Sequence, residues 1–203
     1  MLDAAKPLGN LWVLNRNSQQ ARGLVAWFPT GSSGFAFDPL TNLYLPPIVG
    51  TSPVMTPAGV GIACNTNNRG LRVASPARLN NLLPVTLVVI FWQVSTPTNG
   101  SKYFHISYTN TDTTPFSQYS ISFGNTNDLL AEYNTAGTYG SIIYNNVSPT
   151  TGALHVLIFS HQNGEQVLYL DGVSVASGAA AVSAPTSATA QICIGGHTSD
   201  VTT

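Results

Sequence analysis

The chain has 203 residues, of which seven are Lys or Arg and eight are Asp or Glu, and its net charge is −1. Charged residues make up 7% of it, against about 25% in an average soluble domain. Such a chain has neither the basic surface that binds nucleic acid nor the polybasic segment that binds an anionic membrane. Disorder driven by repulsion between charges is also excluded, because 43% of the residues are hydrophobic.

Neutral residues supply the polarity instead, with 19 Ser, 22 Thr and 17 Asn. Thr favours strands, whereas Ser and Asn favour turns over helix interiors. Together with 18 Gly and 13 Pro, this composition predicts short strands joined by many turns. A nearly neutral surface tends to associate, which is typical of a protein in a larger assembly, and neutral polar surfaces are also common outside cells.

The length favours one large domain over two, and the N-terminal residues favour an arm in front of it. We predict an assembly arm over 1–22, which packs on its own domain or on a neighbour, and a domain over 23–203. The apolar patch of the arm consists of Leu11, Trp12, Val13 and Leu14. We expect no secretory signal, because residues 1–20 lack a continuous apolar stretch. We also expect no transmembrane segment, because the longest apolar run, 87–92, is too short to cross a bilayer.

Segments that are apolar, or that alternate between apolar and polar residues, predict about a dozen strands. In chain order they cover 23–28, 44–45, 60–64, 70–74, 85–93, 102–108, 119–123, 129–134, 141–145, 154–160, 166–170, 173–176 and 190–195. Segment 85–93 is apolar at nearly every position, which predicts a central strand with both faces covered.

Asn-Gly at 99–100 and at 163–164, and Asp-Gly at 171–172, predict tight hairpin turns. These residues accept the positive φ that such turns need. Short strands separated by regular turns predict an all-β fold, an antiparallel two-sheet β-sandwich.

Four segments in order over residues 23–196 carry a family resemblance. They are Gly23-Leu24-Val25-Ala26-Trp27-Phe28, Leu154-His155-Val156, Leu168-Tyr169-Leu170-Asp171-Gly172-Val173 and Ile192-Cys193-Ile194-Gly195-Gly196. They resemble the opening strand, the WHHV strand, the LYVDGV hairpin and the LTIGG strand of concanavalin A-like, laminin-G-like domains. The resemblance implies a jelly roll of two curved antiparallel sheets that pack face to face.

The sequence departs from this family pattern at two places. Ala153 stands where the family usually has Trp, so His155 is the residue of that motif that remains. The chain also ends at Thr203, before the strand that usually closes the family fold. Either the chain is truncated or another segment takes that place, such as the arm or a strand from a neighbouring molecule.

Residues 16–23 also resemble the start of laminin-G-like proteins encoded by bacteriophages. With the low charge and the lack of a secretory signal, this resemblance predicts a location in a virion or on an extracellular surface. The partners expected are further copies of the chain, in a homo-oligomer, or a capsid.

Related jelly rolls include glucanases, which need two carboxylates roughly 5–9 Å apart. The carboxylates that lie close in sequence are Asp128 with Glu132, and Glu165 with Asp171. The first pair spans a turn and the start of a strand, and the second belongs to hairpin turns. We therefore expect no enzymatic activity.

Metal and thiol chemistry are weakly indicated by the sequence. No two of the four His have the spacing of a local zinc pair, and no Asp lies in a calcium motif. We expect no cofactor, and calcium is the one metal that the resemblance leaves open. Cys64 and Cys193 lie in apolar runs, either as buried thiols or as one disulfide.

Aromatic residues are the candidates for glycan binding, because sugars stack on exposed rings while polar groups bind their hydroxyls. Trp27 and Trp92 lie in apolar strands and are expected in the core. Phe116 and four tyrosines lie in predicted loops or at strand ends. The tyrosines expected to bind a ligand are Tyr108, Tyr119, Tyr139 and Tyr144.

The sequence thus predicts a non-enzymatic jelly-roll module for recognition or structure. The first hypothesis is a virion protein for capsid decoration or adhesion, acting through protein or glycan contacts. The alternative is a stand-alone, lectin-like carbohydrate-binding module. A glycoside hydrolase is the third hypothesis, and it requires two carboxylates that face each other across a cleft.

Overall fold

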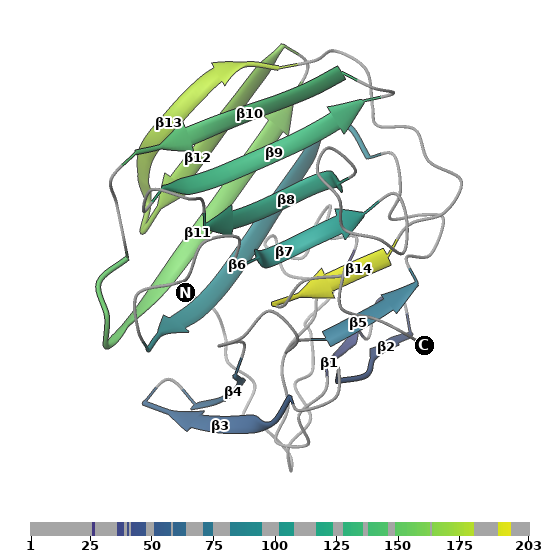
Figure 1. Ribbon diagram of the computed structural model, residues 1–203, viewed down its shortest axis with the longest axis vertical. Coiled ribbons are helices and arrows are strands. Elements are labelled where there is room, and N and C mark those ends of the chain that lie inside the picture. Colours follow the sequence, from purple (N-terminus) through teal and green to yellow (C-terminus); the bar gives the residue numbers. More distant parts are fainter. Residues whose placement is uncertain are drawn as a thin grey trace.

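The computed structural model describes residues 26, 36–38, 40, 42–47, 51–57, 59–63, 71–74, 82–94, 102–107, 117–123, 128–135, 138–145, 149–162, 164–180 and 191–195. These residues form fourteen strands, and no helix is found among them (Figure 1). The first seven strands are β1 (Ala36–Asp38), β2 (Leu43–Leu45), β3 (Pro53–Thr56), β4 (Gly59–Ile62), β5 (Leu71–Ala74), β6 (Val85–Gln93) and β7 (Lys102–Ser107). The others are β8 (Ser117–Phe123), β9 (Leu129–Thr135), β10 (Thr138–Tyr144), β11 (Ala153–Gln162), β12 (Glu165–Leu170), β13 (Val173–Ala179) and β14 (Gln191–Ile194).

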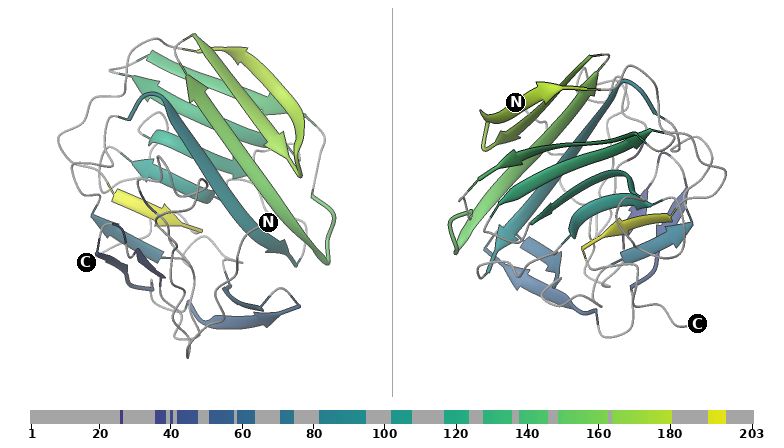
Figure 2. Two further views of the ribbon diagram at one scale, coloured as in Figure 1. Left: turned by 180° about the vertical axis from the view of Figure 1, so that it is seen from behind. Right: turned by 45° about the horizontal axis from the view of Figure 1, so that its top comes forward.

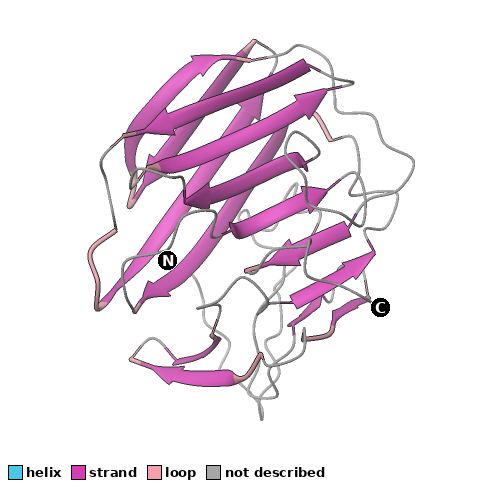
Figure 3. Ribbon diagram, in the orientation of Figure 1, coloured by secondary structure: helices cyan, strands magenta, loops and turns pink. Residues whose placement is uncertain are grey.

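Two antiparallel sheets pack face to face (Figures 1 and 2). The six-stranded sheet has the order β10-β9-β8-β7-β14-β5, and the four-stranded sheet has the order β13-β12-β11-β6. Two small sheets, β1-β2 and β3-β4, lie at the lower end of the molecule in Figure 1. The predicted all-β, two-sheet sandwich is therefore confirmed, and strands dominate the described chain (Figure 3).

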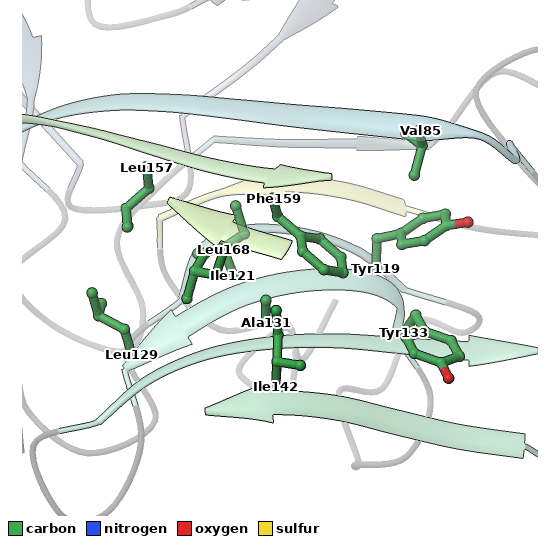
Figure 4. Close-up of a cluster of buried hydrophobic side chains, with 10 residues drawn as sticks. All are labelled: Val85, Tyr119, Ile121, Leu129, Ala131, Tyr133, Ile142, Leu157, Phe159 and Leu168. Carbon is green, nitrogen blue, oxygen red and sulfur yellow. The ribbon is translucent and has the colours of Figure 1, made fainter. Parts of the chain in front are cut away.

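The core lies between the two large sheets, because one face of each is apolar at alternate positions. The six-stranded sheet contributes Tyr119, Ile121, Leu129, Ala131, Tyr133 and Ile142, and the four-stranded sheet contributes Val85, Leu157, Phe159 and Leu168 (Figure 4). A smaller cluster of Leu45, Leu71 and Ile192 joins the small β1-β2 sheet to the lower strands of the six-stranded sheet.

Tight turns connect β11 to β12 and β12 to β13, as the Asn-Gly and Asp-Gly pairs predict. Gln162 pairs with Glu165, and Leu170 pairs with Val173, so each loop has two residues. Asp171 and Gly172 have φ values of 53° and 85°, which are the left-handed conformations that a type I′ turn requires. The three-stranded meander β11-β12-β13 is confirmed.

The predicted strands from 44–45 onward are found, with bounds that differ by a few residues. Residues 29–58 were expected to be loop with short strands, and β1 and β3 lie there without having had bounds predicted. Segment 23–28 lies outside the described residues except for Ala26, which packs against the smaller cluster. The arm over 1–22 and the turn at 99–100 also lie outside them, so the division at residue 22 stays a prediction. No helix in the described part of the chain is long and apolar enough to cross a membrane.

The prediction for segment 85–93 is right about the strand and wrong about the burial of both its faces. Among the described residues, strand β6 is last in the order of the four-stranded sheet. Its alternate residues Val88 and Ile90 are 57% and 66% exposed, so one of its two apolar faces is uncovered. A continuous apolar run shows that both faces are apolar and does not show that both are buried.

Candidate functional site

A buried hydrogen bond between Ser120 and Glu132 lies on the face of the six-stranded sheet that is turned away from the core. Ser120 Oγ donates to Glu132 Oε2 over 2.6 Å, a distance typical of a hydroxyl bound to a carboxylate. Both residues alternate along their strands with core residues such as Ile121 and Ala131, and side chains alternate between the faces of a sheet. Ser120 is fully buried and Glu132 is 3% exposed.

This pair belongs to a row that runs across all six strands of the sheet. Glu132 lies opposite Ser141 of β10, and Ser120 lies opposite His105 of β7. The register continues from His105 to Cys193 and from Cys193 to Arg72. We call these six positions the polar row: Arg72, Cys193, His105, Ser120, Glu132 and Ser141. The structure describes the side chains of Ser120, Glu132 and Ser141, and the backbone register of the other three.

The polar row opens to solvent at its β10 end, since Ser141 is half-buried and Ile143, two residues further on the same face, is 47% exposed. In the other direction along the strands, Tyr139 lies opposite Asn134 at the next register position of that face. The β9-β10 end therefore combines a carboxylate, a hydroxyl and an exposed apolar side chain within a few residues.

A second polar cluster, between His155 of β11 and the β12-β13 turn, holds that turn against the sheet. His155 Nδ1 donates to Asp171 Oδ2 over 2.7 Å, and its Nε2 donates to the Thr150 carbonyl over 2.9 Å. Asp171 Oδ1 accepts from the Val156 backbone N–H, and the Asp171 N–H donates to the Val156 carbonyl, both over 2.9 Å. Because both partners of the ring are acceptors, His155 makes both bonds only as an imidazolium.

The charges of this His155–Asp171 pair agree with that geometry. Burial of the His155 ring opposes protonation, but the bond to the Thr150 carbonyl and the bond and charge of Asp171 outweigh it and raise the pKa of His155 above 6.5. Burial works in the opposite direction on Asp171. There the Val156 N–H and the His155 bond and charge outweigh burial and lower the pKa of Asp171 below 3.8.

One of the four tyrosines predicted to bind a ligand lies in the core instead. Tyr119 is 1% exposed, and its hydroxyl donates to the Leu82 carbonyl, so it offers no ring on which a sugar could stack. This corrects the assignment of Tyr119 as a ligand-binding residue. Tyr144 is half-buried and packs against the main core cluster, and its role as a ligand-binding residue stays a prediction.

The remaining predicted site residues are only partly placed. Tyr139 lies in β10 two residues before Ser141, and its side chain is outside the described set. Tyr108 and the assembly patch of Leu11, Trp12, Val13 and Leu14 lie outside the described residues. Trp92 was expected in the core and is half-buried, on the outer face of β6.

Acidic residues do not gather into a metal site in the described residues, where no group of three or more His, Cys, Asp or Glu could hold an ion. Glu165 and Asp171 lie at opposite ends of β12. Sequence reasoning missed the Ser120–Glu132 pair, although the alternation of Ser120 and Ser122 with Tyr119, Ile121 and Phe123 marks a strand with one polar face.

A comparison with protein families matches residues 66–203, more than half of the chain, to the concanavalin A-like lectin/glucanases superfamily. The chain belongs to this superfamily. A comparison with curated protein sequences gives no significant match.

A comparison with solved structures gives matches of different quality. Domain 4 of AbnA, a GH43 extracellular arabinanase from Geobacillus stearothermophilus solved with arabinotriose, is 17% identical with a TM-score of 0.56, covering 79% of this chain and 77% of that one. The enzymatically active domain of tailspike protein 2 of bacteriophage CBA120 is 10% identical with a TM-score of 0.49, covering 71% and 24%. Sheep galectin-11 is 8% identical with a TM-score of 0.34, covering 56% and 91%.

Proposed function

We propose that this concanavalin A-like protein is a carbohydrate-binding module that holds a neutral glycan at the β9-β10 end of the polar row without cleaving it. The observation that carries the proposal is the Ser120–Glu132 hydrogen bond beside Ser141. A carboxylate whose orientation is fixed by a neighbouring hydroxyl is a strong acceptor for sugar hydroxyls. Glu132 itself is 3% exposed, so we expect a sugar to reach the pair from the half-buried Ser141, which lies opposite Glu132 at the edge of the row.

The surroundings of Glu132 suit both sides of a sugar ring. Ser141 supplies a hydroxyl at the register position opposite Glu132, and Ile143 offers an exposed apolar side chain on the same face. Sugars have polar edges and apolar C–H faces, so they need this mixture of groups. The net charge of −1 favours a neutral glycan over a polyanionic one, which would need a basic surface.

Two comparisons support the class of ligand. The superfamily is named for lectins and glucanases, and the arabinanase domain that shares the fold was solved with arabinotriose.

Binding without hydrolysis is favoured by the number of carboxylates in the polar row. Glycosidases place a second carboxyl group about 5–9.5 Å from the first. Glu132 is the one acidic residue of the row, and Asp128, four residues earlier, is roughly 13 Å away along an extended strand. The row therefore offers a hydrogen-bond acceptor and lacks the acid–base pair of a retaining or inverting glycosidase.

The test is an array of neutral oligosaccharides, arabinotriose included, probed with the full chain and two variants. We expect Glu132→Gln to weaken binding at least tenfold, because the amide removes the charge and keeps the shape. Ser141→Leu should abolish binding by filling the site while leaving the Ser120–Glu132 bond in place. Glu165→Gln, which changes an exposed carboxylate on the other sheet, is the matched control and should bind normally.

Two results would contradict the proposal: no oligosaccharide bound by the unmodified chain, or binding by Glu132→Gln and Ser141→Leu that equals the control. Melting temperatures of all variants separate loss of binding from loss of the fold.

A second candidate function is a structural component of a virion, as capsid decoration or adhesion protein. The apolar residues Val88 and Ile90, exposed on the outer side of β6, favour it because they suit a protein contact. Co-sedimentation of the chain with the particle encoded by the same genome tests this role, and a chain that stays in the supernatant would argue against it.

A further inference from the structure

The outer face of the four-stranded sheet exposes apolar side chains where a solvated sheet would carry polar ones. We define the outer apolar face by six residues of β6 and β11: Val88, Ile90, Trp92, Leu154, Val156 and Ile158. Val88, Ile90 and Leu154 are 57%, 66% and 48% exposed, and the other three are half-buried. Antiparallel sheets that face water on one side normally alternate hydrophobic and polar residues.

The register makes these six residues one continuous patch. Val88 lies opposite Ile158, Ile90 opposite Val156, and Trp92 opposite Leu154, so three apolar cross-strand pairs follow one another. Tyr169 of β12 continues the patch beyond Ile158.

Charged residues lie only at the ends of this face within the described chain. Glu165 is exposed beside the 163–164 turn, and Asp171 is in the turn at the other end of β12. Between them the outward positions carry aliphatic, aromatic or hydroxyl side chains. An apolar patch whose neighbouring positions are polar is typical of a protein–protein interface.

We propose that a second copy of this chain packs on the outer apolar face, sheet against sheet, about a twofold axis. A twofold axis brings a patch against itself, so a charged patch would repel its own copy, whereas an uncharged apolar one is self-complementary. The net charge of −1 adds little repulsion between two copies. Aliphatic side chains of two stacked sheets interdigitate at a spacing of about 10 Å, as in the core of a sandwich.

The four-stranded sheet as a whole, of which the outer apolar face is a part, is just large enough for such a dimer. Its strands have nine, ten, six and seven residues, which give a projected area of roughly 500 Å² at about 3.3 Å per residue and 4.8 Å between strands. Two such sheets would bury about 1,000 Å², which is about the area that a specific interface needs. A dimer of moderate affinity is therefore expected, dissociating on dilution.

The test is sedimentation equilibrium of the full chain over a wide range of concentrations. The unmodified chain should rise from the monomer mass of 21.4 kDa toward twice that value. Ile90→Lys should raise the dissociation constant by about 100-fold or more, because in a symmetric dimer the charge is buried twice in the apolar part of the interface. Ile90→Thr, which keeps strand propensity, should give a smaller increase in the same direction.

Met55→Lys is the matched control, because Met55 is 76% exposed on β3, outside the two large sheets. It should dimerise like the unmodified chain, and circular dichroism should show that all variants keep the strand spectrum. A monomer at every concentration would overturn the proposal. A dimer of unchanged affinity in folded Ile90→Lys would also overturn it, by placing the contact elsewhere.

Discussion

At the scale of single residues, the His155–Asp171 pair predicts how stability depends on pH. The raised pKa of His155 means that its protonated form stabilises the fold fully below pH 6.5, and this contribution is lost as pH rises through the folded value. The lowered pKa of Asp171 gives a contribution that is present above pH 3.8 and is lost as pH falls through the folded value. Both contributions are present between these limits.

His155→Gln should therefore lower the free energy of unfolding most between pH 4 and pH 6. A loss of about 1 kcal/mol is expected there for a partly exposed charged hydrogen bond. The cost should shrink above pH 7, because the unmodified chain then loses its own imidazolium. Denaturant titrations of both proteins across this pH range measure the difference between their free energies of unfolding. The other histidines titrate in both proteins, so their effect cancels in this difference. A difference that does not change with pH would show that the proton on His155 contributes nothing.

Residue identity also explains which site residues could be predicted. Asp171 as a turn residue followed from the Asp-Gly pair, whose positive φ values of 53° and 85° are found. Tyr119 was misplaced because a tyrosine suits either a core or a binding surface. Tyr119 shares the apolar face of its strand with Ile121, whereas Ser120 lies on the polar face. This alternation identifies Tyr119 as a core residue. The hydrogen bond between Ser120 and Glu132 depends on the pairing of β8 with β9, which sequence alone did not give.

At the scale of elements, the packing of β9 against β10 depends on a glycine. The Tyr133 ring lies over Gly140, its partner in the register, and stacks on His161 with ring centroids 4.4 Å apart. A Cβ on Gly140 would lie 2.2 Å from Tyr133 Cζ, so the ring would have to leave its place on His161.

We expect Gly140→Ala to destabilise the fold by about 1–3 kcal/mol, the usual cost of overpacking. Gly61→Ala is the control, since a Cβ there meets nothing within 4 Å, and it should be neutral or stabilising by up to about 1 kcal/mol. Chemical denaturation compares the two variants. Equal stabilities would mean that the Tyr133 ring is not held over Gly140.

Strands were the best-predicted elements, because their signals are local. The bounds of β6 agree with the predicted segment, and the two-residue turns fixed the β11-β12-β13 meander. The positions of the short strands β1 and β3 could not be predicted, since three or four residues show too little alternation and β3 begins with Pro53. The exposure of β6 was missed for another reason: the order of strands in a sheet depends on contacts between distant segments.

At the scale of the whole molecule, the two large sheets have outer faces of opposite character. The six-stranded sheet carries the polar row, which we propose binds a glycan, and the four-stranded sheet carries the outer apolar face, which we propose binds a second copy. Two faces on opposite sides of one sandwich can act at the same time. A dimer joined through its four-stranded sheets would present two glycan sites facing away from each other, which suits it to cross-link two glycans rather than to bind one surface twice.

The most direct measurement of the central claim is an NMR titration of the full chain with the neutral oligosaccharide that gives the strongest array signal. We predict amide shifts that concentrate on β8, β9 and β10 around Ser120, Glu132 and Ser141, with the oligosaccharide recovered intact. Shifts confined to the four-stranded sheet, or cleavage of the oligosaccharide during the titration, would contradict it.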